Sequence, residues 1–293
     1  MRRTRSAASG FSRRALMSTG LLWATSAWAR GWDKHIEQTA LGPLEWGEWG
    51  SGGVVLSIHG TPGGFDTGLA TGRLVGTGFR YLATSRSGYL GTPAPRGLGA
   101  SESLRREADL YAALLDKLHI ERVPVLAYSG GGPFALTFAT RYPERCRAVV
   151  LASGETQRDP ETRAGHFWRR VTEEMEAASD AVSWLPPLVA PHTAFSEVLR
   201  SVWPISRRLG GMVRDDDIFA TLPDLELEKV RQPVLQVHGT SDRIVPFRHA
   251  TAAAGRLPHT ELFPVKHGSH FSTIQSGSKA AARIVAFLAD YAG

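Results

Sequence analysis

Residues 123–132 read Val-Pro-Val-Leu-Ala-Tyr-Ser-Gly-Gly-Gly, an apolar run that ends in one serine and three glycines. The short run predicts a buried strand, and the apolar residues of 134–141 predict a helix directly after it. Ser129 therefore lies in a sharp turn from strand to helix. Ala127 and Gly131, two positions before and after it, are small enough for strand and helix to approach while the serine Oγ projects outward. This nucleophile-elbow pattern, with alanine in place of the first glycine, makes Ser129 a candidate nucleophile.

Two other interpretations of Ser129 stay open from these residues alone. A serine in this position could cap an ordinary helix, and a glycine-rich turn from strand to helix could hold a phosphate. Residues 129–133, Ser-Gly-Gly-Gly-Pro, depart from the dinucleotide motif G-x-G-x-x-G, and the chain has no G-x-x-x-x-G-K-[ST]. Nucleotide binding is therefore disfavoured, whereas a helix cap is not.

A serine nucleophile needs a base that takes its proton and an acid that orients the base. Asp242 follows a predicted strand at 234–237, and His270 follows a predicted strand at 260–265. Serine, aspartate and histidine in this chain order are typical of a catalytic triad placed on an α/β sheet. Ser129, Asp242 and His270 are therefore the candidate catalytic residues.

Outside these motifs, short apolar runs alternate with stretches of helical spacing in residues 30–154 and 226–293. Such alternation predicts an α/β fold, with a mostly parallel sheet and helices on both of its faces. Residues 155–225 interrupt the alternation with a stretch rich in Trp and Pro, which predicts an inserted helical lid. The other predicted elements are a hairpin of strands 36–39 and 44–49, strands 54–58, 79–84 and 148–152, and helices 101–118, 247–256 and 273–291.

With these motifs, the chain resembles the α/β-hydrolase superfamily from about residue 35 to its end. Residues 59–64, His-Gly-Thr-Pro-Gly-Gly, resemble the oxyanion loop of that family. Residues 86–91, Arg-Ser-Gly-Tyr-Leu-Gly, resemble its Arg-x-Gly-Tyr-Gly loop. The resemblance implies the α/β-hydrolase fold with a lid.

The resemblance also implies a role for each candidate residue. Ser129 would be the nucleophile, His270 the general base and acid, and Asp242 the carboxylate that holds the imidazole tautomer. The backbone N–H groups of Thr61 and Gly130 would form the oxyanion hole. Because these donors are backbone groups, the identity of the Thr61 side chain is expected to matter little.

Four other ionisable residues lie near these motifs. His267 is an alternative base, but the family pattern places the histidine two positions after a glycine, which favours His270. Glu155, just after a predicted strand, is an alternative acid, as in some members of the family. His59 is expected to support the oxyanion loop, and His238 is expected at the end of a strand.

A serine at the elbow points to an ester, thioester, lactone or activated amide as the small-molecule substrate. It argues against haloalkane dehalogenases and epoxide hydrolases, which resemble this chain but carry a carboxylate there. Perhydrolases and carbon–carbon hydrolases share the triad, and proline iminopeptidases share the loop at 59–64, so these activities stay open. A binding module of the same fold without catalytic activity is the alternative to an enzyme. The candidate pocket residues, which could equally pack the lid onto the core, are Tyr128, Phe167, Trp168, Trp184, Leu185, Phe195 and Trp203.

The sequence predicts no cofactor and no metal site. His267 and His270 are three positions apart but lack a third ligand nearby in the sequence. The acidic residues 215–217 are expected to form a solvated turn, since no calcium-loop pattern accompanies them. No metal chemistry is therefore expected.

The formal net charge of +6 is concentrated at the start of the chain. Residues 1–29 contain five of the 34 basic side chains and no acid, so the remainder carries 29 basic against 28 acidic residues. A nearly neutral remainder gives little reason to expect nucleic acid as a partner.

Residues 1–29 resemble a twin-arginine export signal. Arg13 and Arg14 precede an apolar run of about 13 residues, shorter than the ~20 needed to span a bilayer, and Ala27-Trp28-Ala29 resembles a cleavage site. A basic tail or a short anchor is the alternative. We expect an exported, periplasmic or secreted protein without stable membrane insertion, or a cytoplasmic one if the signal is not used. Cys146 is the one cysteine, so no disulfide within the chain can form.

Overall fold

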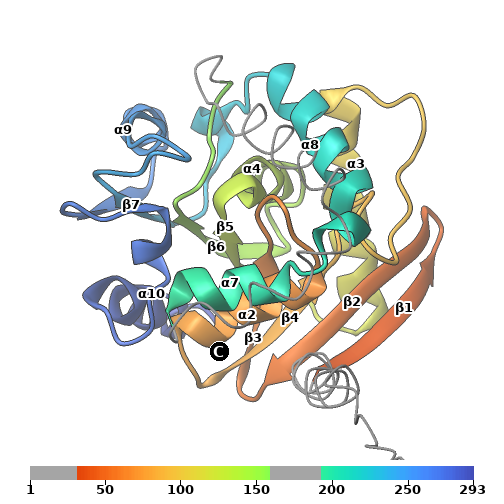
Figure 1. Cartoon of the computed structure of the whole chain (residues 1–293), viewed down its shortest axis with the longest axis horizontal. Coiled ribbons are helices and arrows are strands. Elements are labelled where there is room, and N and C mark those ends of the chain that lie inside the picture. Colours follow the sequence, from red (N-terminus) through yellow and green to blue (C-terminus); the bar gives the residue numbers. More distant parts are fainter. Residues whose placement is uncertain (1–31, 159–192) are drawn as a thin grey trace, which may run out of the picture. The chain divides into compact units, whose positions relative to one another are not determined.

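The strands form one sheet in the order β1-β2-β4-β3-β5-β6-β7-β8 (Figure 1). The computed structural model describes residues 32–158 and 193–293. β2 runs antiparallel to β1 and β4, and the other neighbours are parallel. The strands are β1 (Asp33–Thr39), β2 (Gly42–Gly50), β3 (Gly53–Ile58), β4 (Phe79–Thr84), β5 (Val123–Tyr128), β6 (Cys146–Ala152), β7 (Val234–Gly239) and β8 (Thr260–Val265). The predicted, mostly parallel α/β sheet is confirmed.

Helices cover both faces of this sheet. On β3, the side chain of Leu56 joins a buried cluster with helices α3 and α4, whereas the next side chain, Ser57, donates a hydrogen bond to Gly68 O of α2 at 2.8 Å. Successive side chains of a strand point to opposite faces, so α2 lies on the face away from α3 and α4. The helices are α2 (Phe65–Val75), α3 (Ala100–Lys117), α4 (Gly132–Arg141), α7 (Ala194–Ser201), α8 (Leu209–Ala220), α9 (Arg248–Ala254) and α10 (Lys279–Ala289).

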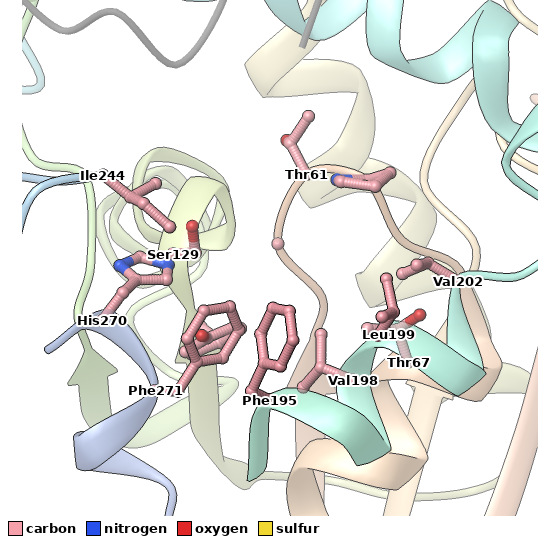
Figure 2. Close-up of a pocket in the computed structure, with 13 residues that line it drawn as sticks. Thr61, Thr67, Ser129, Phe195, Val198, Leu199, Val202, Ile244, His270 and Phe271 are labelled. Carbon is pink, nitrogen blue, oxygen red and sulfur yellow. The ribbon is translucent and has the colours of Figure 1, made fainter. Parts of the chain in front are cut away.

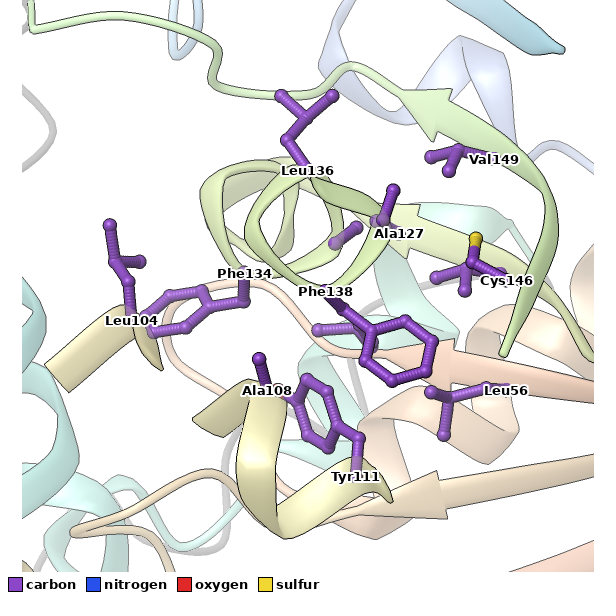
Figure 3. Close-up of a cluster of buried hydrophobic side chains, with 14 of the residues drawn as sticks. Leu56, Leu104, Ala108, Tyr111, Ala127, Phe134, Leu136, Phe138, Cys146 and Val149 are labelled. Atoms are coloured by element: carbon purple, nitrogen blue, oxygen red, sulfur yellow. The ribbon is translucent and has the colours of Figure 1, made fainter. Parts of the chain in front are cut away.

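The largest apolar cluster fills the space between the sheet and the pair α3–α4 (Figure 3). Tyr111 of α3 and Phe138 of α4 meet edge to face, with ring centroids 6.0 Å apart. Truncating a buried aromatic side chain such as Phe138 to alanine typically costs about 3–5 kcal/mol. This packing holds α4, and with it the turn that carries Ser129, against the sheet.

Helix α2 was not predicted, and α10 begins at Lys279 rather than at residue 273. In α2 the reason is local. Its apolar residues are interrupted by glycines that the packing requires. A Cβ at Gly68 would lie 2.8 Å from the Ala83 Cβ, and a Cβ at Gly72 would lie 2.5 Å from the Tyr81 ring. Small residues at a close helix–sheet contact weaken the hydrophobic period from which a helix is predicted.

Between β6 and β7 the chain makes a long excursion, of which residues 193–225 are described; we call these the β6–β7 segment. Here α7 packs against α2, and α8 packs against α3 (Figure 1). The acidic residues 215–217 are not a solvated turn, because they lie within α8 and Asp215 is only 1% exposed. The prediction of a lid over 155–225 extends into residues 159–192, outside the described residues.

Candidate active site

Ser129 occupies a strained turn between β5 and α4. Its φ is 53°, in the left-handed region that non-glycine residues enter at a cost of about 1–3 kcal/mol. The surrounding backbone is tight: a Cβ at Gly131 would lie 2.7 Å from Ile58 O, and a Cβ at Gly60 would lie 2.8 Å from the Ser129 Cβ. Such geometry is typical of a nucleophile elbow and is more than a helix cap requires.

Asp242, in the loop after β7, holds the ring of His270, which begins the short helix η4 (His270–Thr273). Asp242 Oδ2 lies 2.8 Å from His270 Nδ1, and Oδ1 accepts the N–H groups of Ile244 and Val245 at 2.9 and 3.0 Å. Burial alone would raise the pKa of Asp242. The hydrogen bond and the charge of His270, together with the hydrogen bond from the Ile244 N–H, outweigh burial and bring this pKa below its ordinary value. The carboxylate is therefore ionised at neutral pH.

The bond to Asp242 determines the tautomer of His270. An ionised carboxylate can only accept, so His270 Nδ1 carries a hydrogen, and in the neutral form of the ring the lone pair is on Nε2. Figure 2 shows the side chains of His270 and Ser129 next to each other on one side of a pocket that both residues line. Ser153 Oγ donates to His270 O at 2.9 Å and so supports η4, a contact that no sequence pattern indicated.

The alternative base and acid occupy other positions. His267 is exposed on the surface, whereas His270 is buried. The backbone N–H of Glu155 donates to Ser129 O at 3.1 Å, and it is Asp242 that bonds the His270 ring. His238 lies in β7, as expected, and its Nε2 donates to a backbone carbonyl at 2.8 Å.

The two residues expected to supply the oxyanion donors are neighbours. A Cβ at Gly130 would lie 2.8 Å from the side-chain oxygen Oγ1 of Thr61, and Thr61 lines the same pocket as Ser129. His59 Nδ1 donates to Gly60 O at 2.7 Å, and its Nε2 accepts the Arg86 N–H at 3.1 Å. Burial, followed by the charge of Arg86, lowers the pKa of His59 well below its ordinary value. Neutral His59 therefore supports the loop.

A second buried carboxylate, Asp215 of α8, contacts the same loop. Its Oδ1 accepts Arg86 Nη1 at 2.6 Å, and its Oδ2 accepts Arg86 Nη2 at 2.7 Å and the Tyr89 hydroxyl at 2.6 Å. The Thr61 hydroxyl also donates to Oδ2. The Thr61 side chain is therefore held in a charged network, contrary to the expectation that its identity matters little. The motifs had singled out the loops that contain Arg86, Tyr89 and Thr61, but no sequence pattern indicated Asp215 as their partner, because it lies 126–154 residues further along the chain.

The pocket beside Ser129 has a volume of about 50 Å³ and is mainly apolar (Figure 2). Tyr128 and Phe195 line it, as predicted, whereas Trp203 instead packs with the cluster around Tyr89. The other four predicted pocket residues, Phe167, Trp168, Trp184 and Leu185, lie outside the described residues. The lining residues are Gly60, Thr61, Pro62, Thr67, Tyr128, Ser129, Phe195, Val198, Leu199, Val202, Ile244, His270 and Phe271.

Three further observations concern groups that could hold a metal, helices that could cross a membrane, and the thiol of Cys146. Within residues 32–158 and 193–293, no group of three or more His, Cys, Asp or Glu side chains is placed to hold a metal ion. Over the same residues, no helix combines the length and apolar character needed to cross a membrane. Burial raises the pKa of Cys146 to about 12, so its thiol is protonated at neutral pH.

Comparisons with known proteins agree with this fold. The family model described as the alpha/beta hydrolase fold matches residues 53–190. A solved alpha/beta hydrolase fold protein from Nakamurella multipartita is 29% identical and superposes with a TM-score of 0.67 over 87% of this chain and 98% of that one. The chain belongs to the α/β-hydrolase superfamily and is a hydrolase of this fold.

Among individual relatives, the chain is similar to an uncharacterized hydrolase, YcgS, of Bacillus subtilis, with 35% identity over 116 residues. That match spans 40% of this chain and only 39% of the relative. It is also similar to a 2-hydroxymuconate semialdehyde hydrolase of Pseudomonas putida, with 25% identity over 82% of this chain and 89% of that protein. The relatives are thus hydrolases.

Proposed function

We propose that this protein is a serine hydrolase that cleaves small, uncharged esters through an acyl-enzyme on Ser129. The observation that carries the proposal is the ring of His270, whose Nδ1 is bonded to Asp242 at 2.8 Å while the ring lies beside a serine held at φ 53°. A base oriented by a buried carboxylate next to a strained serine is the arrangement that activates a hydroxyl.

In the proposed reaction, Ser129 Oγ bonds to the acyl carbon while its proton passes to His270 Nε2. The negative charge that develops on the acyl oxygen is stabilised by the N–H groups of Thr61 and Gly130. His270 then gives the proton to the departing alcohol oxygen, which leaves the acyl group on Ser129. Water then attacks the acyl carbon while its proton passes to His270; the bond from this carbon to Ser129 Oγ breaks, His270 returns the proton to Oγ, and a carboxylic acid leaves. Asp242 stabilises the imidazolium in both steps.

The pocket indicates the class of substrate. The described lining contains no Asp, Glu, Lys or Arg side chain, which favours an uncharged substrate. The cavity is small, about 50 Å³, which favours a short acyl group. We therefore expect acyl groups from acetyl to butanoyl to be preferred, with the corresponding amides as poorer substrates.

The first test is labelling with a fluorophosphonate, followed by turnover of p-nitrophenyl esters from acetate to octanoate. We expect Ser129→Ala to abolish labelling and to lower kcat by about 10⁵-fold or more. His270→Ala is expected to lower kcat by a similar factor. The matched control is His267→Ala, at an exposed histidine three residues away, which should retain the wild-type kcat. Wild-type labelling that persists in Ser129→Ala would contradict the proposal.

The same enzyme can be compared on substrates of the related activities. Prolyl amides test a peptidase, hydrogen peroxide with a carboxylic acid tests a perhydrolase, and a vinylogous diketone tests carbon–carbon hydrolysis. If one of these substrates is turned over with a higher kcat/KM than any ester, the main activity is that reaction and not ester hydrolysis, while the proposed role of the triad stands. A folded wild type that neither labels nor turns over any substrate would favour the non-catalytic binding module.

We also propose two features outside the site. Residues 155–225 would form a lid between core parts 30–154 and 226–293, which is supported by the four residues between 193 and 203 that line the pocket. Residues 1–29 would be an export signal, which is supported by their twin-arginine pattern. Mass spectrometry of the protein from its native cell tests the latter: we expect a mature N-terminus near residue 30. An intact N-terminus on cytoplasmic protein would contradict export.

A further inference from the structure

We propose that Asp215 of α8 is a positioning residue for the oxyanion hole, because it holds the peptide whose N–H belongs to Thr61. This inference rests on the proposed function. The residues involved come from three separate parts of the chain: the loop at 59–64, the loop at 86–91 and helix α8 of the β6–β7 segment. Their connection starts at the Gly60–Thr61 peptide.

Gly60 C=O and Thr61 N–H belong to one planar peptide unit. The unit is trans, so its carbonyl oxygen and its N–H point in opposite directions. Gly60 O accepts two hydrogen bonds, from His59 Nδ1 at 2.7 Å and from Arg86 Nη2 at 3.2 Å. These two donors fix the plane of the peptide and direct the Thr61 N–H away from His59 and Arg86. A rotated peptide would instead present its carbonyl oxygen where the N–H is needed.

Arg86 can hold this peptide only while its own position is fixed. The guanidinium is 1% exposed and lies over the ring of Phe134 at 4.2 Å. Asp215 binds it through both carboxylate oxygens, and Oδ2 also accepts the hydroxyls of Tyr89 and Thr61. A bidentate pair of this kind fixes direction as well as position. Asp215 thus orients Arg86 towards Gly60 O and holds the Thr61 side chain directly.

The β6–β7 segment also holds the loop at a second point. Arg208 donates to Gly63 O at 2.6 Å and forms an ion pair with Asp66 at 2.7 Å. Asp215 therefore contacts this stretch at Thr61, and Arg208 contacts it at Gly63 and Asp66. The docked position of α8 and the direction of the Thr61 N–H are consequently linked.

The test compares Asp215→Asn with a matched control in the same segment. Glu197 of α7 is also buried, and its carboxylate forms ion pairs with Arg73 of α2 at 2.7 Å and with Arg200 of its own helix at 3.2 Å. Glu197→Gln makes the same change from acid to amide. A second pair of variants acts at Thr61: Thr61→Val removes the hydroxyl at nearly constant shape, and Thr61→Ser restores it.

We expect Asp215→Asn to lower kcat by about 10- to 100-fold, less than the 10²–10³-fold loss of an entire oxyanion donor, with KM changed by less than about threefold. Affinity for a trifluoromethyl ketone, which forms an oxyanion adduct on the serine, should fall by the same factor as kcat/KM. Thr61→Val should lose about three- to tenfold in kcat, and Thr61→Ser should recover most of it. Glu197→Gln should leave kcat and the affinity for the trifluoromethyl ketone unchanged.

Three results would overturn the inference in an active wild type. They are an unchanged kcat in Asp215→Asn, an equal loss in Glu197→Gln, and a loss confined to KM. If Asp215→Asn does not fold, the Thr61 pair decides, because equal kcat in Thr61→Val and Thr61→Ser also contradicts the inference. A wild type that neither labels with fluorophosphonate nor cleaves esters would overturn the proposed function itself, so the two failures are distinguishable.

Discussion

Asp242 and Asp215 are both buried carboxylates near Ser129, but the chain holds them in different ways. Asp242 takes two of its hydrogen bonds from backbone N–H groups within three residues and a third from His270, 28 residues later. Asp215 takes its bonds from the side chains of Arg86, Tyr89 and Thr61, which lie 129, 126 and 154 residues away.

The difference in how they are held explains why substitutions at these two carboxylates are expected to have different effects. Asp242 is secured by its own loop and faces a titratable imidazole, so a change there acts mainly on the proton transfer. Asp215 is secured only when α8 meets the core, and it faces a permanent cation that is buried with it. A change at Asp215 or Arg86 therefore acts on stability and geometry together.

The largest expected effect tests the carboxylate at the imidazole. Asp242→Asn should lower kcat by about 10⁴-fold, because the amide favours the wrong tautomer of His270. The measurement is kcat on p-nitrophenyl acetate at neutral pH, with a circular dichroism spectrum to show that the variant is folded. A loss below tenfold in folded protein would mean that His270 does not act through Asp242.

The next effect tests the buried pair on the other side of the comparison. Arg86→Met should lower the free energy of unfolding by about 3–5 kcal/mol, since it leaves Asp215 as a buried charge without its cation. Replacing both residues, as Arg86→Met with Asp215→Leu, should recover much of that stability. Urea unfolding measures both variants. A double variant no more stable than the single one would show that the penalty comes from lost packing.

The melting temperature measured against pH tests how much the charge of Asp242 stabilises the fold. Because the pKa of Asp242 is lower in the folded protein than in the unfolded chain, its ionised form stabilises the fold above the unfolded value of about 3.9. That contribution disappears as the pH falls through the folded value. The difference in Tm between wild type and Asp242→Asn should therefore be largest at neutral pH and narrow below about pH 4. A constant difference would contradict this.

The smallest effect concerns the pocket wall that the β6–β7 segment supplies. Val198→Ala should enlarge the pocket and raise the kcat/KM ratio of hexanoate to acetate esters by about tenfold, the effect of one or two methylenes in an apolar pocket. Val213→Ala, at a 60% exposed valine of the same segment, is the matched control. An equal change in both variants would argue against contact between Val198 and the acyl chain.

Much of the core was predictable because its signals are local. Strands β5 and β8 begin and end as predicted, and β5 is a short, fully buried apolar run that ends at a turn. Helix α2 was not predicted, because close packing requires glycines at 68 and 72 that break its apolar period. The acidic residues 215–217 were expected in a solvated turn, because three adjacent carboxylates are typical of the protein surface. The buried arginine that pairs with Asp215 comes from a distant part of the chain.

The sequence by itself determined the fold class, the elbow at Ser129 and the order of the candidate triad, because each depends on neighbouring residues: apolar period, small residues at a turn, and polar residues at strand ends. Only the tertiary structure decided which side chains of distant segments meet. The pairing of Asp215 with Arg86 is one example and the docking of α7 over the pocket is another. Such contacts follow from how layers pack, and no local pattern encodes the partner of a buried charge 129 residues away.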